Sequence, residues 1–345
     1  MLRVGIVGLG FMGWVHWLVY KRLAGIEVVA ICEQDAVRRG GDWRSIRGNF
    51  GPPGEMVDLS KIRVFDSLDR MLSEGDVDLV DICLPPSLHS EAVLVSLDAG
   101  KHVFCEKPMA LTVADCEKMV DRARQVNRRL YVGHVLPFFP EYSVARQAVR
   151  SGEYGRLLGG TFKRVISDPK WLKDFYNPAR IGGPLIDLHI HDAHFIRLLF
   201  GMPRRALSRG RVRGGVVSYC NSLLEFDDPT IVVSCVSGVI DQQGRPFNHA
   251  FELHFERATI QFEFAAFADK SESMPLKILT ENGDVIRPAL IATDDIAGFV
   301  AEIEEVKACI LGNRDSEILG GELARDALII SQMQSEAVFS GAKSE

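Results

Sequence analysis

The second residue of the chain opens an apolar segment that leads into a glycine-rich turn, and this pairing limits the possible folds more than any other feature. Leu2–Gly8 reads LRVGIVG, and Gly8–Gly13 then reads G-L-G-F-M-G. An apolar stretch of helical length, Phe11–Leu23, follows. A strand, a glycine turn of this spacing and a helix together predict the first βα unit of a dinucleotide-binding fold.

The three glycines have different roles in this prediction. Gly8 allows the tight turn, Gly10 lets a diphosphate approach the backbone, and Gly13 lets the helix pack closely on the strand. Phe11 and Met12 lie at the helix N-terminus, where unpaired N–H groups and the helix dipole favour an anion. We therefore expect all five residues to take part in cofactor binding.

A second predicted strand, Ile26–Cys32, ends at Glu33, which lies 20 residues beyond Gly13. A dinucleotide-binding βαβ unit places its ribose-binding acid at this distance. Glu33 can accept hydrogen bonds from both adenosine ribose hydroxyls and would repel a 2′-phosphate, so NAD is expected in preference to NADP. Arg38 and Arg39 keep NADP as the alternative, because an arginine can partner a phosphate.

Composition argues against several classes of partner. The chain has 40 Lys and Arg against 46 Asp and Glu, a formal net charge of −6, and no basic block, so neither nucleic acid nor a membrane is expected. No apolar run approaches the roughly 18–20 residues that span a bilayer, and no secretory leader is expected. The seven cysteines are scattered without a C-x-x-C pair, which predicts reduced thiols in a cytoplasmic protein.

The first part of the chain alternates strands with helices, which predicts a parallel sheet with right-handed crossovers. Further strands are expected at Val77–Cys83, His102–Cys105 and Leu130–His134, with helices at Leu88–Ala99 and Val113–Gln125. The Gly/Pro-rich segment Gly40–Lys61 is expected to be a surface insertion. A Rossmann domain, a doubly wound parallel α/β sheet, should therefore occupy residues 1–135.

The second part of the chain has a different rhythm. Helices are predicted at Glu141–Arg150 and Pro184–Phe200, with a strand between them at Gly155–Ile166. From Arg204 to about Leu279 strand follows strand, which predicts an open, mostly antiparallel sheet. Two helices, Asp294–Leu311 and Leu319–Ser340, follow. Residues 136–345 should thus form an α+β domain for substrate binding and oligomerisation, whose C-terminal helices can pack back on the first domain.

Two predicted strands of the first domain are followed by polar segments at their carboxyl ends, where open α/β sheets bind ligands. These segments read LPPSLH over residues 84–89 and CEKP over residues 105–108. Lys107 could polarise a carbonyl or stabilise a developing alkoxide, or it could be a solvated surface lysine. His89 could contact the cofactor or only begin a helix. The candidates for cofactor contact here are Leu84, Pro85, His89, Glu106 and Lys107.

The second domain offers a cluster of acids and histidines, GGPLIDLHIHDAH, over residues 182–194. On a helix Asp187 and His191 are i and i+4 and share a face, with His194 next to them. A histidine beside a carboxylate is the usual acid/base pair. Two alternatives remain at this point: His189 and His191 could ligate zinc with nearby aspartates, or the histidines could be satisfied members of a polar helix face.

Three motifs together resemble the Gfo/Idh/MocA oxidoreductase family, named for glucose–fructose oxidoreductase, inositol dehydrogenase and a rhizopine-catabolism protein. They are the terminal G-x-G-x-x-G, the stretch AGKHVFCEKPMA (residues 99–110) and the downstream G-G-x-x-x-D-x-x-x-H. The resemblance spans essentially the whole chain. It implies a catalytic group of Lys107, Asp187 and His191, no metal, and a homo-oligomer that is a dimer or a tetramer. His189, where a glycine is common, and His194 depart from the family pattern.

The resemblance also implies the reaction, an NAD(H)-dependent hydride transfer at a secondary alcohol or keto group of a sugar, polyol or related carbohydrate. In the oxidative direction His191 would take the hydroxyl proton, Lys107 would stabilise the developing alkoxide, and Asp187 would orient His191 or a substrate hydroxyl. It further implies a cis Lys107–Pro108 bond. Weaker candidates for substrate contact are Lys163, Arg164, Trp171 and His194.

Three other functions remain compatible with the sequence. The first is a non-catalytic NAD-binding regulator, which would not need the Lys107, Asp187 and His191 set. The second is a metal-dependent hydrolase, which would need His189 and His191 as ligands. The third is glycosidase-type activity through a transient NAD-dependent oxidation.

Overall fold

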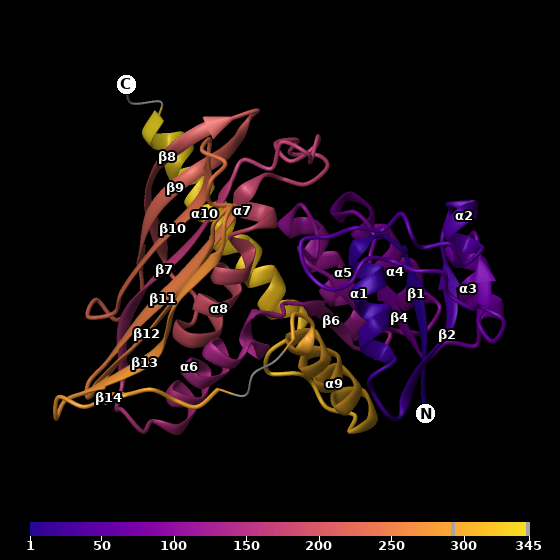
Figure 1. Cartoon of the computed structure of the whole chain (residues 1–345), viewed down its shortest axis with the longest axis horizontal. Helices are drawn as coiled ribbons and strands as arrows, with labels where there is room; N and C mark the ends of the chain where they lie inside the picture. The colour runs from indigo at the N-terminus through magenta and orange to yellow at the C-terminus, as the bar shows by residue number, and fades with distance from the viewer. Residues whose placement is uncertain (291–293, 343–345) are drawn as a thin grey trace. The chain divides into compact units, whose positions relative to one another are not determined.

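The structure of the chain is a computed structural model, and it describes residues 1–290 and 294–342. The chain divides into two compact units (Figure 1). The first unit comprises residues 1–138 and 292–325, and the second comprises residues 139–291 and 326–345. The chain thus first passes from the first unit to the second after residue 138.

The first unit contains a six-stranded parallel sheet in the order β3-β2-β1-β4-β5-β6. The strands are β1 (Leu2–Val7), β2 (Ile26–Cys32), β3 (Arg63–Phe65), β4 (Leu79–Ile82), β5 (His102–Glu106) and β6 (Leu130–Gly133). All four residues of β4 and of β6 are buried, as expected of parallel strands covered on both faces. This strand order is that of the doubly wound dinucleotide-binding fold, and it confirms the predicted α/β class.

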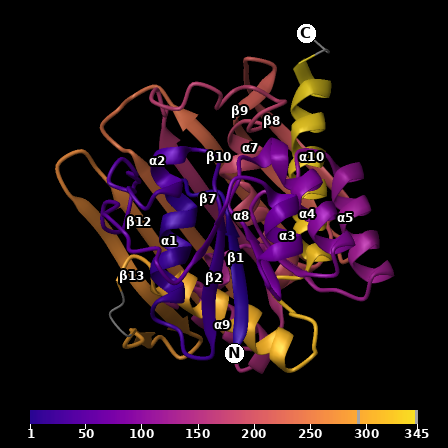
Figure 2. The same cartoon turned by 90° about the vertical axis from the view of Figure 1, so that its right-hand side faces the viewer.

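Helices connect successive strands along the chain. The N-terminal strand β1 lies in the middle of the sheet (Figure 2). The helical elements of this unit are α1 (Phe11–Tyr20), α2 (Ala36–Arg39), α3 (Leu68–Glu74), η1 (Pro86–Leu88), α4 (His89–Asp98), α5 (Val113–Gln125), η2 (Leu136–Phe138) and α9 (Ala297–Leu311). Strand β3 and helix α3 lie where the sequence analysis placed no element. They were missed because a three-residue strand and a two-turn helix show too little periodicity to detect.

The Gly40–Lys61 segment is mostly exposed, as expected of a surface insertion, but a few buried side chains anchor it to the first unit. Trp43 is fully buried, and its ring lies 5.8 Å from that of Trp14 and 5.1 Å from that of Trp17, both on α1. The indole N–H of Trp14 also donates to the Pro52 carbonyl (2.9 Å). The segment is therefore held against α1 by buried aromatic contacts, which hydrophobicity patterns in a Gly/Pro-rich stretch do not reveal.

The second unit contains an eight-stranded sheet in the order β14-β13-β12-β11-β7-β10-β9-β8. The strands are β7 (Leu157–Ser167), β8 (Arg205–Arg213), β9 (Val216–Glu225), β10 (Val232–Ile240), β11 (Phe247–Phe255), β12 (Ala258–Ala266), β13 (Ser271–Thr280) and β14 (Val285–Ile286). Only β7 and β10 pair in parallel, and the other described pairs are antiparallel. The prediction of a mostly antiparallel sheet is confirmed.

Helices pack on one face of this sheet (Figure 1). They are α6 (Pro140–Ser151), α7 (Pro184–Asp187), α8 (Ile190–Phe200) and α10 (Gly321–Ala342), of which residues from 326 onward belong to this unit. The prediction of one continuous helix over Pro184–Phe200 is wrong, because the helix is interrupted at residues 188–189. The N–H of His189 bonds to the carbonyl of Pro184 (2.9 Å), five residues back, so one extra residue is accommodated in that turn.

Two further predictions concern the cysteines and the membrane-spanning potential of the helices. All seven cysteines are buried and unbridged. Burial raises the pKa of several of these thiols, to about 11 for Cys32 and Cys220 and about 12 for Cys116. In the described part of the chain no helix is both long and apolar enough to cross a membrane.

Candidate active site

The glycine turn after β1 has the geometry that a bound diphosphate requires. Gly8 has φ +90°, and a Cβ there would come within 2.8 Å of the Cys83 carbonyl oxygen. A Cβ at Gly13 would lie 2.1 Å from the Gly8 carbonyl oxygen, so close packing of α1 on β1 needs glycine there. A Cβ at Gly10 would meet nothing within 4 Å. The backbone at Gly10 therefore faces open space in which a cofactor phosphate would fit.

Phe11 and Met12, both half-buried, occupy the first turn of α1 beside these glycines. The Phe11 ring packs edge-on against Phe50 of the Gly40–Lys61 segment, with ring centroids 4.8 Å apart. Gly48 lies so close that a Cβ there would come within 1.8 Å of the same ring. The segment thus fixes the side chain of Phe11 at the glycine turn.

Glu33 lies directly against the glycine turn. Its Oε2 accepts the N–H of Leu9 (2.7 Å), and its Oε1 accepts the N–H of Asp35 (2.9 Å). Arg38 donates to the Leu9 carbonyl (3.2 Å), and Arg39 donates to the Glu33 carbonyl (2.9 Å). The structure therefore brings the expected ribose-binding acid and both arginines into one corner of the first unit.

Glu106 ends β5 and Lys107 begins the turn after it. The Glu106 side chain is nearly buried, and its Oε2 accepts the backbone N–H of Lys107 (3.1 Å). Lys107 is half-buried, and the bond between Lys107 and Pro108 is cis, which confirms that expectation. Both residues lie at the carboxyl edge of the parallel sheet, as the sequence predicted.

His89 connects two turns at this edge. It is fully buried, with Nδ1 lying 2.8 Å from the Pro108 carbonyl oxygen and Nε2 lying 2.7 Å from that of Leu84. Burial lowers the pKa of His89. This geometry speaks against direct contact between the ring and a cofactor, and it makes His89 a support for both turns. Leu84 is half-buried and Pro85 is exposed at the end of β4, where a ligand could reach them.

The acid/base candidates of the second unit lie on either side of the helix interruption. Asp187 is the last residue of α7 and His191 is the second residue of α8, and both are half-buried. The i, i+4 argument from a continuous helix therefore does not apply to them. Gly183 begins α7 with φ +81°, and a Cβ there would lie 2.5 Å from Val216 of β9. The short helix is thus pressed against the sheet.

Arg164 is not available to a substrate, which corrects its place among the weak candidates. Its guanidinium forms a buried, two-pronged ion pair with Asp192 of α8, at 2.7 and 2.9 Å. Burial alone would raise the pKa of Asp192, but the charge of Arg164 outweighs it and lowers that pKa to about 2. The pair ties α8 to β7.

The other weak substrate candidates are not brought together either. Lys163 pairs with Glu263 (2.9 Å), and because side chains alternate along a strand it points to the sheet face opposite Arg164. His194 is fully buried in α8, and Trp171 is 70% exposed in the loop after β7. Among the described residues of the second unit, these candidates therefore do not line one common substrate site.

One cluster near this loop was not predicted. Asp168, buried at the end of β7, accepts hydrogen bonds from the Tyr176 hydroxyl and from Arg213, both at 2.8 Å. Burial and the Asp168 carboxylate raise the pKa of Tyr176 to about 12. The cluster anchors the loop between β7 and α7, and no sequence spacing could have revealed it.

The structure also bears on the metal alternatives. His189 turns its Nε2 into the core toward Gln334 of α10 (2.8 Å), so this nitrogen is engaged away from the zinc site considered for His189 and His191. Among the described residues one group is dense enough to be weighed as a metal centre, namely His16, Asp81 and Cys83, with donor atoms within 4.8 Å of one another. The Nδ1 of His16 lies 2.8 Å from an oxygen of Asp81, however, so these two donor groups contact each other directly at hydrogen-bond distance.

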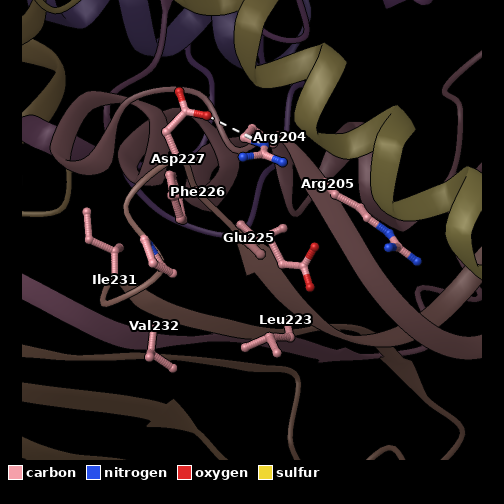
Figure 3. Close-up of a pocket in the computed structure, with 10 residues that line it drawn as sticks. Arg204, Arg205, Leu223, Glu225, Phe226, Asp227, Ile231 and Val232 are labelled. Carbon is pink, nitrogen blue, oxygen red and sulfur yellow. Dashed lines mark ion pairs between the residues drawn. The ribbon is translucent and has the colours of Figure 1, made fainter.

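A surface pocket of the second unit lies elsewhere, where β8, β9 and β10 meet their connecting loops (Figure 3). Arg204 and Asp227 form an exposed ion pair there (3.5 Å), and the apolar side chains of Leu223 and Val232 also line the pocket. The pocket contains none of the predicted site residues.

Comparison with known families identifies the chain. Residues 2–134 match the model of an oxidoreductase family with an NAD-binding Rossmann fold, and residues 142–261 match the C-terminal domain of the same Gfo/Idh/MocA family. The chain belongs to the Gfo/Idh/MocA oxidoreductase family. This confirms the resemblance read from the motifs and the predicted pairing of an α/β with an α+β domain.

One relative with a named activity matches most of the chain, and two uncharacterized relatives match a smaller part of it. The myo-inositol 2-dehydrogenase of Thermotoga maritima is 26% identical over 298 residues, which are 82% of this chain and 80% of that protein. Against two uncharacterized oxidoreductases, from Streptococcus pneumoniae (28% identical) and Rhizobium meliloti (32% identical), the match takes in 61% and 58% of this chain. It spans only 53% and 56% of their own lengths.

Solved structures show the same fold. An aldose-aldose oxidoreductase from Caulobacter crescentus, complexed with glycerol, is 23% identical with a TM-score of 0.79, covering 99% of this chain and 98% of that one. The WlbA dehydrogenase from Bordetella pertussis, in complex with NADH and UDP-GlcNAcA, is 17% identical with a TM-score of 0.75, covering 99% and 97%.

Proposed function

We propose that this member of the family is an NAD(H)-dependent dehydrogenase acting on a secondary alcohol or keto group of a sugar, polyol or related carbohydrate. The observation that carries the proposal is the cradle after β1, where Gly10 leaves open space and Glu33 lies against the same turn. Bound there, NAD(H) would supply the hydride acceptor or donor at its nicotinamide ring. The relative from T. maritima, a named polyol dehydrogenase, supports the substrate class.

Three side chains of the chain are assigned to the chemistry. In oxidation His191 takes the proton of the substrate hydroxyl, and Lys107 stabilises the negative charge that develops on the oxygen. Asp187 orients His191 or a neighbouring substrate hydroxyl. In reduction the same groups return the proton. The assignment rests on the matched family motifs, on the half-buried setting of each residue, and on the buried contacts that fix the turns carrying them.

The proposed cofactor is NAD in preference to NADP. Glu33 holds its carboxylate beside the glycine turn by accepting two backbone N–H groups, so a 2′-phosphate in that corner would meet a fixed negative charge. Arg38 and Arg39 each already donate to a backbone carbonyl, which favours their serving the turn over binding phosphate. The remaining cofactor contacts are proposed at Gly8, Gly10, Gly13, Phe11, Met12, Leu84, Pro85, Glu106 and Lys107.

Two properties of the whole protein complete the proposal. We place it in the cytoplasm, since its seven thiols are buried and unbridged. We also propose a homo-oligomer, a dimer or tetramer, through the sheet face of the second unit that bears no helix in Figure 1. Light scattering of the purified protein tests the second statement, and a single-chain mass would contradict it.

The experiment that tests the function is a screen of sugars and cyclic polyols for NADH formation at 340 nm, run in parallel with NAD and NADP. The proposal predicts that at least one compound is oxidised, with NAD as the better cofactor. Tight binding of NAD without turnover of any carbohydrate, in either direction, would favour the regulator. Release of an aglycone from glycosides with no net NADH would favour the glycosidase-type activity.

A further inference from the structure

A charged cluster lies buried inside the first unit, below the turn that carries Lys107. His16 of α1 lies between two carboxylates, with Nδ1 2.8 Å from Asp81 of β4 and Nε2 3.1 Å from Glu106 of β5. His16 and Asp81 are fully buried, and Glu106 is 6% exposed. A carboxylate near each ring nitrogen favours a protonated imidazolium by its charge, although only the Nδ1 contact with Asp81 is a hydrogen bond and the Nε2–Glu106 contact is an ion-pair approach without one.

The other groups that face His16 do not supply a competing cation. Cys83 lies 3.3 Å from Nδ1, and Tyr20 donates its hydroxyl to Asp81 (2.9 Å). Burial raises the pKa of both, so each stays neutral. The ring of Phe104 stacks on the imidazole, with centroids 5.4 Å apart.

The remaining acid of the cluster is Glu302 of α9. It is fully buried, and neither of its oxygens has a hydrogen-bond partner among the described residues. Burial, reinforced by repulsion from Glu106, raises the pKa of Glu302 well above its usual range, so it is a neutral acid. Burial alone would lower the pKa of His16, but the charge of Asp81 and its hydrogen bond outweigh burial and raise it.

Glu106 transmits this arrangement to the candidate active site. One of its oxygens faces His16, and the other accepts the backbone N–H of Lys107. Removing the cation would leave the buried Glu106 carboxylate with the Lys107 N–H but no partner of opposite charge, which favours its moving from this position. The position of Glu106 therefore depends on His16.

We infer that His16 is a positioning residue: a buried cation that holds the Glu106 carboxylate in place, and through it fixes the turn bearing Lys107. The inference rests on the proposed function for its catalytic meaning, since Lys107 belongs to that proposal. Glu106 also ends β5 at the edge where open α/β sheets bind ligands. Its negative charge would then favour the positively charged ring of NAD⁺ over the neutral ring of NADH.

The first test measures the charge of His16 and needs neither cofactor nor substrate. In the full chain with ¹⁵N-labelled histidines, two-bond ¹H–¹⁵N spectra report the protonation of each ring nitrogen across a pH series. His16, identified by the signal lost in His16→Gln, should remain doubly protonated at pH 8, where an ordinary histidine is neutral. A neutral His16 at pH 7 would overturn the inference.

Two glutamates provide a matched pair of variants, since both are buried near His16 but only one should carry charge. Glu106→Gln should lower the midpoint of the His16 titration by at least about one pH unit, the effect of losing a partner charge, whereas Glu302→Gln should leave it unchanged. Equal effects of the two variants would contradict the account. If His16→Gln does not fold, Asp81→Asn identifies the signal by its shift.

The second test separates positioning from a merely structural role. The ratio of the dissociation constants for NADH and NAD⁺, measured by calorimetry, should fall by roughly three- to tenfold in Glu106→Gln and in His16→Gln, but not in Glu302→Gln. An unchanged ratio would remove the electrostatic part of the inference. Stoichiometric metal in the purified protein, with loss of the doubly protonated signal, would overturn it. Failure to bind either cofactor would refute the proposed function while the first test still decides the state of His16.

Discussion

The two units hold their candidate residues by different means. In the first unit Glu33 and Lys107 each follow the end of a parallel strand, so the sheet itself places them. In the second unit Asp187 and His191 lie on either side of the interruption between α7 and α8. A buried ion pair from Arg164 to Asp192 fixes α8 to the sheet. The first arrangement follows from short-range spacing, and the second depends on contacts between distant parts of the chain. The same difference predicts where each unit is vulnerable.

The largest effect is expected when one residue is removed from each unit. Lys107→Ala should lower turnover by roughly 10²–10⁴-fold, the usual value of a positioned group acting on the transferred proton or its oxygen. Combining it with His191→Ala should cost more than either change alone but less than their product, because both serve one step. Steady-state kinetics on the substrate found by screening measures this. If the two losses of turnover simply multiplied in the double variant, the two residues would act independently. Lys118→Ala, at an exposed position, is the control.

The ion pair of the second unit should be the next most sensitive point. Arg164→Met leaves Asp192 charged and buried without its guanidinium partner, which should lower the free energy of unfolding by about 3–5 kcal/mol. Urea unfolding at pH 7 measures the loss. Replacing both partners by apolar residues, Arg164→Met with Asp192→Leu, should recover most of it. A single variant as stable as the wild type would show that the pair does not hold α8.

A pH effect should appear at His249 of the same unit, which lies 2.9 Å from the Tyr142 hydroxyl. Burial lowers the pKa of His249 to about 3, against about 6.5 in an unfolded chain. Between these values the unfolded chain binds a proton that the folded one does not, so stability is lost as the pH falls below about 6.5.

His249→Phe should remove this contribution, which amounts to about 2 kcal/mol at pH 5. Unfolding in urea at pH 7, 6 and 5 should therefore show a shallower pH dependence in the variant than in the wild type. His254→Gln, at a partly exposed position on the same strand, should keep the wild-type slope. Identical slopes for His249→Phe and the wild type would contradict a neutral, buried His249.

The smallest effect concerns cofactor choice in the first unit. NAD should bind at least about tenfold more tightly than NADP, since a 2′-phosphate beside the Glu33 carboxylate costs on the order of 1.4 kcal/mol. Glu33→Ser should narrow this difference in affinity, and Glu27→Ser, at an exposed position on β2, should not. Calorimetric titration with both cofactors measures it. Equal affinities in the wild type would contradict the role given to Glu33.

The first unit was predictable because its signals are local. The apolar strands, the glycine spacing and the acid after β2 lie within one βαβ unit, and the structure reproduces the expected bounds of β2 and α5. The buried partners of His16 were missed, although two polar residues inside apolar segments, His16 and Asp81, offered a signal. A buried histidine and a buried acid on neighbouring elements are natural partners.

The second unit was less predictable because its decisive contacts are distant in sequence. The helix interruption accompanies the contact of His189 with Gln334, 145 residues away. Arg164 and Asp192, 28 residues apart, gave no pattern to show that they pair, so Arg164 was expected at the substrate. The residue types of the acid/base group were recognisable, but the backbone on which they lie was not.

The most direct test of the account is single-turnover formation of NADH by the wild type and by His191→Ala, with NAD affinity measured on the same samples. The proposed division between the units predicts that His191→Ala lowers the rate roughly 10²–10⁴-fold while NAD binds as in the wild type. The wild-type rate should rise with pH as the catalytic group loses a proton, and this rise should shift or vanish in the variant. Near-normal turnover in His191→Ala would contradict the account, and His194 or Lys107 would then have to be tested as the base.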